Sequence, residues 1–219
     1  MFTPICEDRR VTTEDNHPVE PQQLRRTVLI VALLNFSYFF VEFSVALTAG
    51  SVSLLADSVD FLEDTAINLL IFVALGWSLA RRATLGKLMT LVLLTPAFLA
   101  GWKAIEGFAN PVPPLVTPLV LASLGAIVVN GVSAVLLSRV RHHRGSLSAA
   151  AFLSARNDVL VNVAIIAMGI LTAATRSGWP DLMLGVGIIL LGLHAAREVW
   201  EASEDERLAA RALAGEQID

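Results

Sequence analysis

The sequence of 219 residues contains a single cysteine, Cys6, and only 16% of its residues are charged. One cysteine excludes a framework of intrachain disulfides and a zinc site built from several thiolates. A soluble domain has about a quarter of its residues charged, whereas this chain is 55% hydrophobic with a mean hydropathy of +0.65. The composition therefore indicates a membrane protein.

Six segments approach the length of about 20 apolar residues that a helix needs to cross a bilayer. They cover residues 26–48, 52–77, 87–108, 115–138, 149–173 and 180–199. Runs such as "IVVNGVSAVLL" do not alternate apolar and polar residues, as the strands of a membrane barrel would. The sequence predicts an all-α integral membrane protein with six transmembrane helices.

Polar segments flank this predicted membrane domain, which we place at residues 25–200. The tail over residues 1–24 has no apolar stretch and is not expected to be a cleavable signal peptide. The charged tail over residues 201–219 is too short to bury a core of its own. We expect no soluble domain after the membrane part.

Basic residues favour one side of the predicted helices. Arginine and lysine gather in the first tail and in the connections after the second and fourth segments, whereas the other loops contribute only Arg176. Because positive residues mark the cytoplasmic side, both termini are expected to be cytoplasmic. The compact loops and the lack of processing signals suggest a multi-pass protein of a cell membrane, namely a bacterial inner membrane.

The second segment carries the stretch "DSVDFLED", which puts four carboxylates into residues 57–64. An ionised side chain at the centre of a bilayer costs about 2.5–3.5 kcal/mol on insertion scales, so these acids need a reason to be there. Asp60 and Asp64 are four residues apart and share one helix face, which Asn68 continues. For Asp57 and Glu63, a ligand role and a packing or ion-pair role are both open.

The fifth segment repeats this pattern with Ser154, Asp158 and Asn162 at the same step of four residues. Two apolar helices with matching polar ladders are suited to face one another. We therefore expect Asp60, Asp64 and Asp158 to meet near the middle of the bilayer.

Three carboxylates in a low dielectric repel one another, and some stay protonated unless a cation joins them. A divalent ion neutralises the charge and must displace protons to bind. The ladders thus predict one site that holds metal and protons in turn, in an alternating-access cycle.

Five stretches together resemble the cation diffusion facilitator family of divalent-metal transporters. They are "NFSYFFVEFSVALTAGS", "GSVSLLADSVDFLEDTAINL", "WKAIEGFANPVPP", "VVNGVSAVLLSR" and "RSGWPDLMLGVGIILLGLHAAREVW". Each motif alone is loose, but their order and spacing over residues 25–200 make the resemblance specific.

The resemblance implies a transporter that exports zinc, manganese, iron, cobalt or cadmium from the cytoplasm in exchange for protons. Its partners are then metal ions, protons and the lipid bilayer, with no nucleic acid and no resident cofactor, and it is not an enzyme. The family motif of His or Asp followed four residues later by Asp falls on Asp60 and Asp64. A similar pair of the fifth helix falls on Ser154 and Asp158.

Two departures from the family pattern matter. Ser154 is a weak neutral ligand where the family often has His or Asp, and Asn157 or water is expected to complete the shell. An all-oxygen set leans toward manganese, iron or magnesium over zinc. The family's C-terminal domain, through which its homodimers also form, is not expected here, which leaves a homodimer through the membrane helices open.

Two other functions compete with transport. An accessory membrane protein derived from a transporter would explain Ser154. A metal-dependent phosphotransferase of the membrane would need Gly and Arg beside its aspartates, and "LLADSVDFLEDTAIN" has neither.

Several smaller polar groups have open roles. His142 and His143 lie in a basic loop, where a solvated surface and metal capture are the alternatives. Polar side chains also lie within the predicted first and fourth helices, at Asn35, Tyr38, Glu42 and Asn130. They either form hydrogen bonds between helices or line an ion path.

Overall fold

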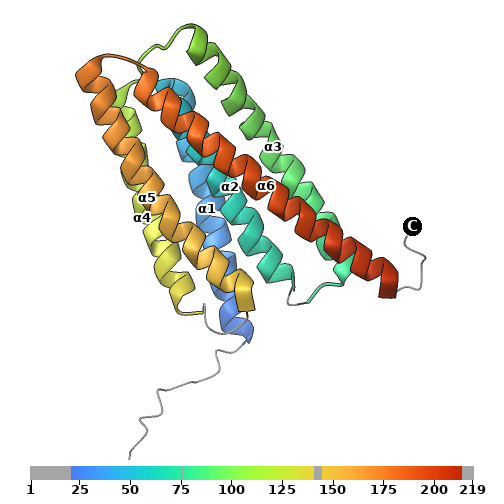
Figure 1. Ribbon diagram of the computed structural model, residues 1–219. Coiled ribbons are helices and arrows are strands. Elements are labelled where there is room, and N and C mark those ends of the chain that lie inside the picture. The colour runs from blue at the N-terminus through green and yellow to red at the C-terminus, as the bar shows by residue number, and fades with distance from the viewer. Residues whose placement is uncertain (1–20, 75, 141–144, 214–219) are drawn as a thin grey trace, which may run out of the picture.

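The computed structural model describes residues 21–74, 76–140 and 145–213, and over these ranges it is helical (Figure 1). Its six helices are α1 (Pro21–Ala49), α2 (Val52–Ala74), α3 (Leu79–Ala109), α4 (Val116–Ser138), α5 (Gly145–Thr175) and α6 (Trp179–Leu213). Each of the six predicted segments falls largely within one of these helices. The prediction of an all-α protein is confirmed for the described residues.

The helices run alternately up and down one bundle (Figure 1). The turns after α1, α3 and α5 meet at one end, which we call the loop end (residues 50–51, 110–115 and 176–178). The shortest of these turns requires Gly50, whose φ of +71° is unfavourable for residues with a side chain. It follows that α2 and α5 are antiparallel.

Among the described residues, four helices are long and apolar enough to cross a membrane. Their apolar spans are Gln22–Ala49, Ala83–Ala109, Val116–Ser138 and Ala151–Thr175. Helix α6 adds a shorter apolar stretch, Trp179–His194. Helix α2 differs because the four acids of residues 57–64 fall in its central turns.

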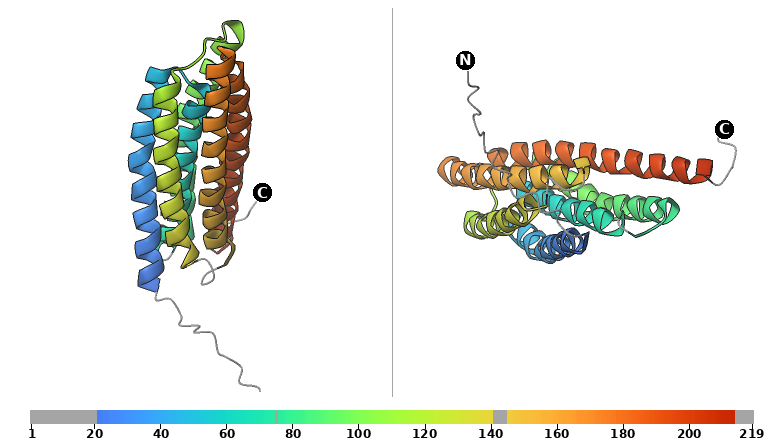
Figure 2. Two further views of the ribbon diagram at one scale, coloured as in Figure 1. Left: turned by 90° about the vertical axis from the view of Figure 1, so that its left-hand side faces the viewer. Right: turned by 90° about the horizontal axis from the view of Figure 1, so that it is seen from below.

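Helix α2 lies at the centre of the bundle, where it packs against α1, α3, α5 and α6 (Figure 2). Residues 51–59 of this helix and the turn before it are all buried. Leu54 and Leu55 belong to a core with Leu119 of α4 and Ile165 of α5. The acids of α2 are therefore screened from the outside of the bundle by the neighbouring helices.

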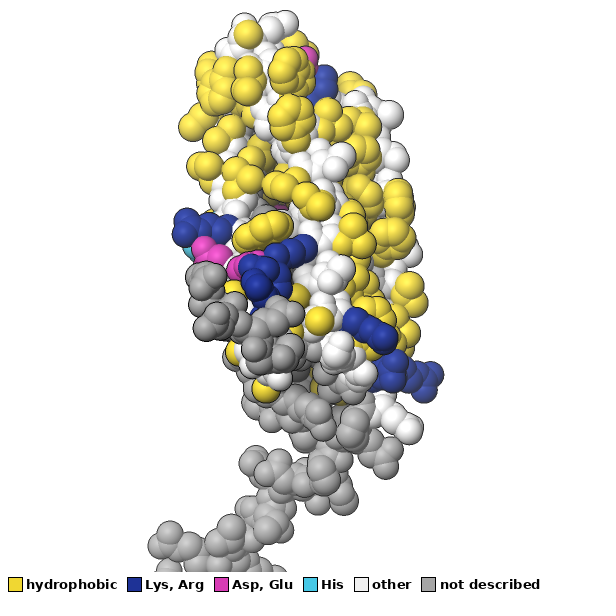
Figure 3. All heavy atoms as spheres, turned by 90° about the vertical axis from the view of Figure 1, so that its right-hand side faces the viewer, with side chains coloured by type: hydrophobic (Ala, Val, Ile, Leu, Met, Phe, Trp, Pro, Cys, Tyr) yellow, Lys and Arg dark blue, Asp and Glu magenta, His cyan; other side chains and the backbone are white. Residues whose placement is uncertain are grey.

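The outer surface of the bundle is largely apolar. Large hydrophobic side chains face outward, for example Phe98, which is 74% exposed, and Leu191, which is 66% exposed. Figure 3 shows such side chains over the upper part of one face and charged ones gathered lower down. An apolar belt of this kind suits lipid rather than water.

Helix α6 continues past the predicted membrane segment and includes most of the tail predicted at residues 201–219. Charged side chains stabilise this extension from within the helix and from α3. Arg197 pairs with Glu201 and Arg207 pairs with Glu204, while Lys87 of α3 also pairs with Glu204. The tail is thus helical as far as Leu213.

Candidate functional site

The polar ladders of α2 and α5 lie against one another. The Ser154 hydroxyl of α5 donates a hydrogen bond of 2.9 Å to Asp64 Oδ1 of α2, and the Asn162 side chain of α5 lies within reach of Asp57. Because the helices are antiparallel, the two ladders run in opposite directions. Ser154 therefore meets Asp64 at one end of the contact and Asn162 meets Asp57 at the other.

Asp60 and Asp158 lie between these two contacts. The carboxyl groups of Asp158 and Asp64 share a hydrogen bond that Asp64 accepts, and Asp158 also interacts electrostatically with Asp64 and Asp60. Asp64 is 2% exposed, whereas Asp60 and Asp158 are half-buried. The structure thus brings four of the five predicted site residues to one region between α2 and α5.

Asn157 is the predicted residue that the structure does not bring to this region. Its side chain is exposed, and its amide oxygen accepts a hydrogen bond of 3.4 Å from Arg156. On a helix, neighbouring residues face directions about 100° apart, so Asp158 and Asn157 cannot both point at α2. Water is the more suitable additional ligand.

The carboxylates are close but not yet arranged as ligands. Within residues 21–74, 76–140 and 145–213, no three side chains of His, Cys, Asp or Glu are placed to hold one metal ion. A cation at this point would therefore have to turn the carboxylates of α2 and α5 toward itself. The metal-binding role of these residues stays a prediction.

Two asparagines repeat the same local contact on the two helices. Asn68 Nδ2 donates to the backbone carbonyl of Asp64 at 2.8 Å, and Asn162 Nδ2 donates to that of Asp158 at 3.1 Å. Each amide oxygen is buried without a hydrogen-bond donor. Carbonyl oxygens of this kind are suitable ligands for hard cations or acceptors for water. The ladder pattern included both asparagines but did not reveal which atom is free.

Helix α1 lines the other side of α2 with its predicted polar stripe. Asn35 and Glu42 are fully buried. The Tyr38 hydroxyl donates a hydrogen bond of 2.6 Å to the carbonyl of Ala122 in α4. Asn130 of α4 is also buried, and its amide oxygen has no donor. Tyr38 thus bonds across helices, one of the two expected roles, whereas Glu42 faces Asp57.

One face of α6 packs against α2 through small residues, which the sequence did not single out. A Cβ atom at Gly185 would lie 2.7 Å from the backbone nitrogen of Ser53, and one at Gly192 would lie 3.6 Å from Asp60 Oδ1. The close approach of α6 to α2 therefore depends on the absence of a side chain at Gly185. Asp60 lies beside Gly192. No sequence signal told which face of the sixth helix would meet the acids.

Asp181 of α6 fixes the start of α2 at the loop end. Its carboxylate accepts hydrogen bonds from the Ser51 hydroxyl at 2.6 Å, the Val52 backbone N–H at 2.7 Å and the Ser53 hydroxyl at 2.5 Å. A carboxylate at a helix N-terminus satisfies free N–H groups and suits the helix dipole. Asp181 is thus a structural acid and not part of the cluster between α2 and α5.

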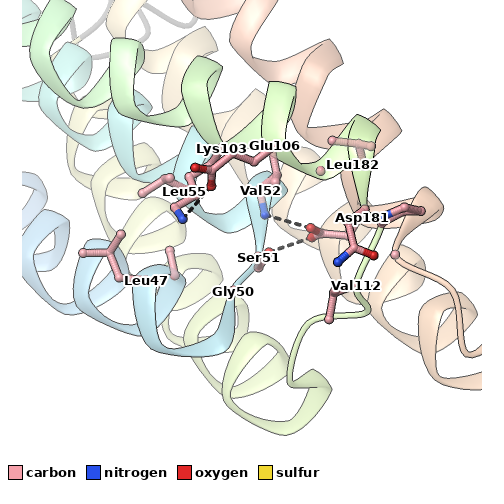
Figure 4. Close-up of a pocket in the computed structure, with 15 residues that line it drawn as sticks. Leu47, Gly50, Ser51, Val52, Leu55, Lys103, Glu106, Val112, Asp181 and Leu182 are labelled. Atoms are coloured by element: carbon pink, nitrogen blue, oxygen red, sulfur yellow. Dashed lines mark hydrogen bonds and ion pairs between the residues drawn. The ribbon is translucent and has the colours of Figure 1, made fainter.

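A cavity of about 330 Å³ opens beside this contact (Figure 4). Lys103 and Glu106 of α3 form an ion pair of 2.9 Å at its rim, and Ser51 and Asp181 lie on its far side (Figure 4). Its charged groups already have partners. The cavity is at the loop end of the bundle, separate from Asp60, Asp64 and Asp158.

Of the four histidines, the structure describes His194, which is exposed on α6. His142, His143, His17 and Cys6 lie outside the described residues.

A family model described as the cation efflux transmembrane domain matches residues 28–205 of the chain. The match covers most of the chain, from the first turns of α1 to the charged part of α6. A search of curated proteins found none that matches.

Proposed function

The chain belongs to the cation efflux family, and from that membership we propose that it exports divalent metal ions from the cytoplasm in exchange for protons. The family is one of cation transporters rather than enzymes. The observation that carries the exchange mechanism is the contact of Asp64 with Ser154, beside Asp158, across α2 and α5.

We propose that all six helices cross the membrane, with both chain termini on the cytoplasmic side. The acids of α2 are compatible with a membrane-spanning α2, because four neighbouring helices surround it. Among the described basic residues, Arg25, Arg26, Arg81 and Arg139 lie at the end of the bundle opposite the loop end. Positive residues prefer the cytoplasmic side, which supports this orientation.

The transported ion would be held by Asp60 and Asp64 from α2 and by Asp158 from α5. The Ser154 hydroxyl, which now donates to Asp64, would turn a lone pair toward the ion instead. Because ligands must be deprotonated, binding releases protons. Protons that return to the same carboxylates would expel the ion on the other side of the membrane.

The ligand set favours hard cations. Carboxylate, hydroxyl and amide oxygens are typical ligands of manganese, iron(II) and magnesium, whereas zinc sites usually include histidine or cysteine. We therefore propose manganese or iron as a better substrate than zinc, with cobalt and cadmium less favoured.

Transport into liposomes tests this proposal. Purified protein is placed in liposomes, and Mn²⁺ uptake and lumen pH are followed together. The variants are Asp64→Asn and Asp158→Asn, with Glu106→Gln as the control because Glu106 lies at the loop-end cavity.

We expect wild type and Glu106→Gln to couple Mn²⁺ uptake to proton movement, and both aspartate variants to lose the coupled flux. Equal flux in all four proteins would reject the site. If the wild type folds but shows no flux, the result would favour an accessory membrane protein that does not transport ions. Ser154, a weak ligand at this position, is the observation that favours this alternative.

A further inference from the structure

A second pair of acids lies between α1 and α2, apart from the proposed ligands. The side chain of Glu42 is 0% exposed and that of Asp57 is 1% exposed, and the two carboxyl groups interact directly. Asp57 lies about one helical turn from Asp60 on the loop-end side. Neither acid belongs to the family motif that falls on Asp60 and Asp64.

The hydrogen bonds around this pair do not satisfy it. Both Glu42 carboxyl oxygens and Asp57 Oδ2 are buried without a donor. The Tyr38 hydroxyl, which lies one helical turn before Glu42 on α1, donates to the Ala122 carbonyl instead. Asn162 reaches Asp57 but also donates to the carbonyl of Asp158.

Among the described residues, the charged groups that act on the pair are negative. Glu42 interacts with Asp57 and, at longer range, with Asp60 of α2 and Asp158 of α5. Asp57 interacts with Glu42 and with Asp64. Tyr38 is the other titratable group that faces both acids from α1.

Two ionised carboxylates cannot both be stable in such surroundings. Burial of an unpaired charge is very unfavourable, and like charges at short distance add to the penalty. One proton held between the two carboxyl groups reduces both penalties, because it removes one of the two charges and makes a strong O–H···O⁻ hydrogen bond to the other.

We propose that Glu42 and Asp57 share one proton, and that this proton leaves when a divalent ion binds at Asp60, Asp64 and Asp158. The inference rests on the proposed function and extends it to a proton site that is separate from the metal ligands. The positive charge of the ion stabilises the ionised pair. By linkage, the proton on the pair weakens binding of the ion to the same extent.

Proton release on metal binding tests this inference without transport. Mn²⁺ is added to the purified full-length protein in detergent with little buffer, and the released protons are counted with a pH indicator. The variants are Glu42→Gln and Asp57→Asn. Glu106→Gln is the matched control, since it makes the same chemical change at an exposed glutamate.

We expect wild type and Glu106→Gln to release the same number of protons per bound Mn²⁺. Glu42→Gln should still bind Mn²⁺ but release about one proton fewer, because its amide keeps the shape of the acid and cannot ionise. Asp57→Asn should show the same loss, since the remaining buried Glu42 then keeps its proton.

The possible failures are distinguishable. Equal proton counts in wild type and Glu42→Gln would overturn this inference and leave metal–proton exchange intact. Mn²⁺ binding by wild type without any proton release would overturn both.

Infrared spectra of wild type and Glu42→Gln give a second check. A protonated carboxyl band that disappears when Mn²⁺ binds to wild type, and that is missing from Glu42→Gln, supports the shared proton. A spectrum without change in the carboxyl region contradicts it.

Discussion

The hydroxyl of Ser154 in α5 lies 2.9 Å from the Asp64 carboxylate of α2 and donates a hydrogen bond to it. Ser154, which we propose as a ligand, thus stabilises the carboxylate that it faces. This contact sets the register of the two helices, and that register brings Asp158 next to Asp64 and Asp60. The first prediction concerns the choice of metal at this position.

Ser154→His should shift the metal preference toward zinc, because imidazole is a better ligand for zinc than a hydroxyl. The measurement is competition between Zn²⁺ and Mn²⁺ for binding to the purified protein. Ser154→Ala is the control, since it removes the hydroxyl without adding a ligand, and it should weaken both ions. An unchanged preference in Ser154→His would show that this side chain does not reach the ion.

Gly192→Val should weaken metal binding. The new Cβ would lie 3.6 Å from Asp60 Oδ1, and its methyl groups would remove water from the carboxylate and restrict its rotation. Gly187→Val is the matched control on the same helix, because a Cβ there meets nothing within 4 Å. We expect Mn²⁺ titrations of Gly187→Val to match wild type. The same affinity in both variants would mean that Asp60 does not need this space.

Gly185→Ala should destabilise the bundle by about 1–3 kcal/mol, the usual range for overpacking a close contact. Its Cβ would meet the backbone of Val52 and Ser53 at 2.7–2.8 Å, so that α6 must move away from α2. Thermal unfolding in detergent measures the effect. In Gly187→Ala the higher helix propensity of alanine should instead leave stability unchanged or slightly higher. Equal melting temperatures for the two variants would contradict the close approach.

The ion pairs of Glu204 predict a pH dependence of stability. Arg207, and then Lys87 of α3, lower the pKa of the Glu204 carboxyl from 4.5 to about 2. A lowered pKa means that the ion pairs stabilise the folded state above pH 4.5, and that this contribution is lost as the pH falls toward 2. The melting temperature of wild type should therefore exceed that of Glu204→Gln at neutral pH, and the difference should shrink through this window.

Glu201→Gln is the control for this comparison, because Glu201 pairs with Arg197 of its own helix. Its melting temperature should differ less from wild type at neutral pH. A difference for Glu204→Gln that stays constant between pH 7 and about pH 3 would show that the link to α3 is not responsible.

The helices were predictable because the apolar runs are long. The polar residues of α2 and α5 also recur every four residues, a spacing that places them on one face of a helix. That spacing also predicted that the two ladders face one another. It did not reveal their register, because two matched ladders can slide past one another by one turn, so the pairing of Asp64 with Ser154 came only from the structure. The ligand role of Asn157 stays a prediction, since its side chain is exposed on α5 and bonds to Arg156.

The sequence did not predict which residues of α6 and α1 lie beside the acids of α2. Gly192 looks like any other glycine of an apolar helix until the packing shows Asp60 beside it. Glu42 was recognised as unusual, but a carboxyl in a membrane helix has many possible partners. Only the three-dimensional arrangement shows that its partner is another acid, Asp57.

The central claim is that Asp64 and Asp158 hold one transported ion between them. Calorimetric titration of Mn²⁺ into purified wild type, Asp64→Asn, Asp158→Asn and the double variant tests it most directly. We predict that each single variant lowers the affinity by about 100-fold or more, and that the double variant is little worse than either. Wild-type affinity in both single variants would contradict the account.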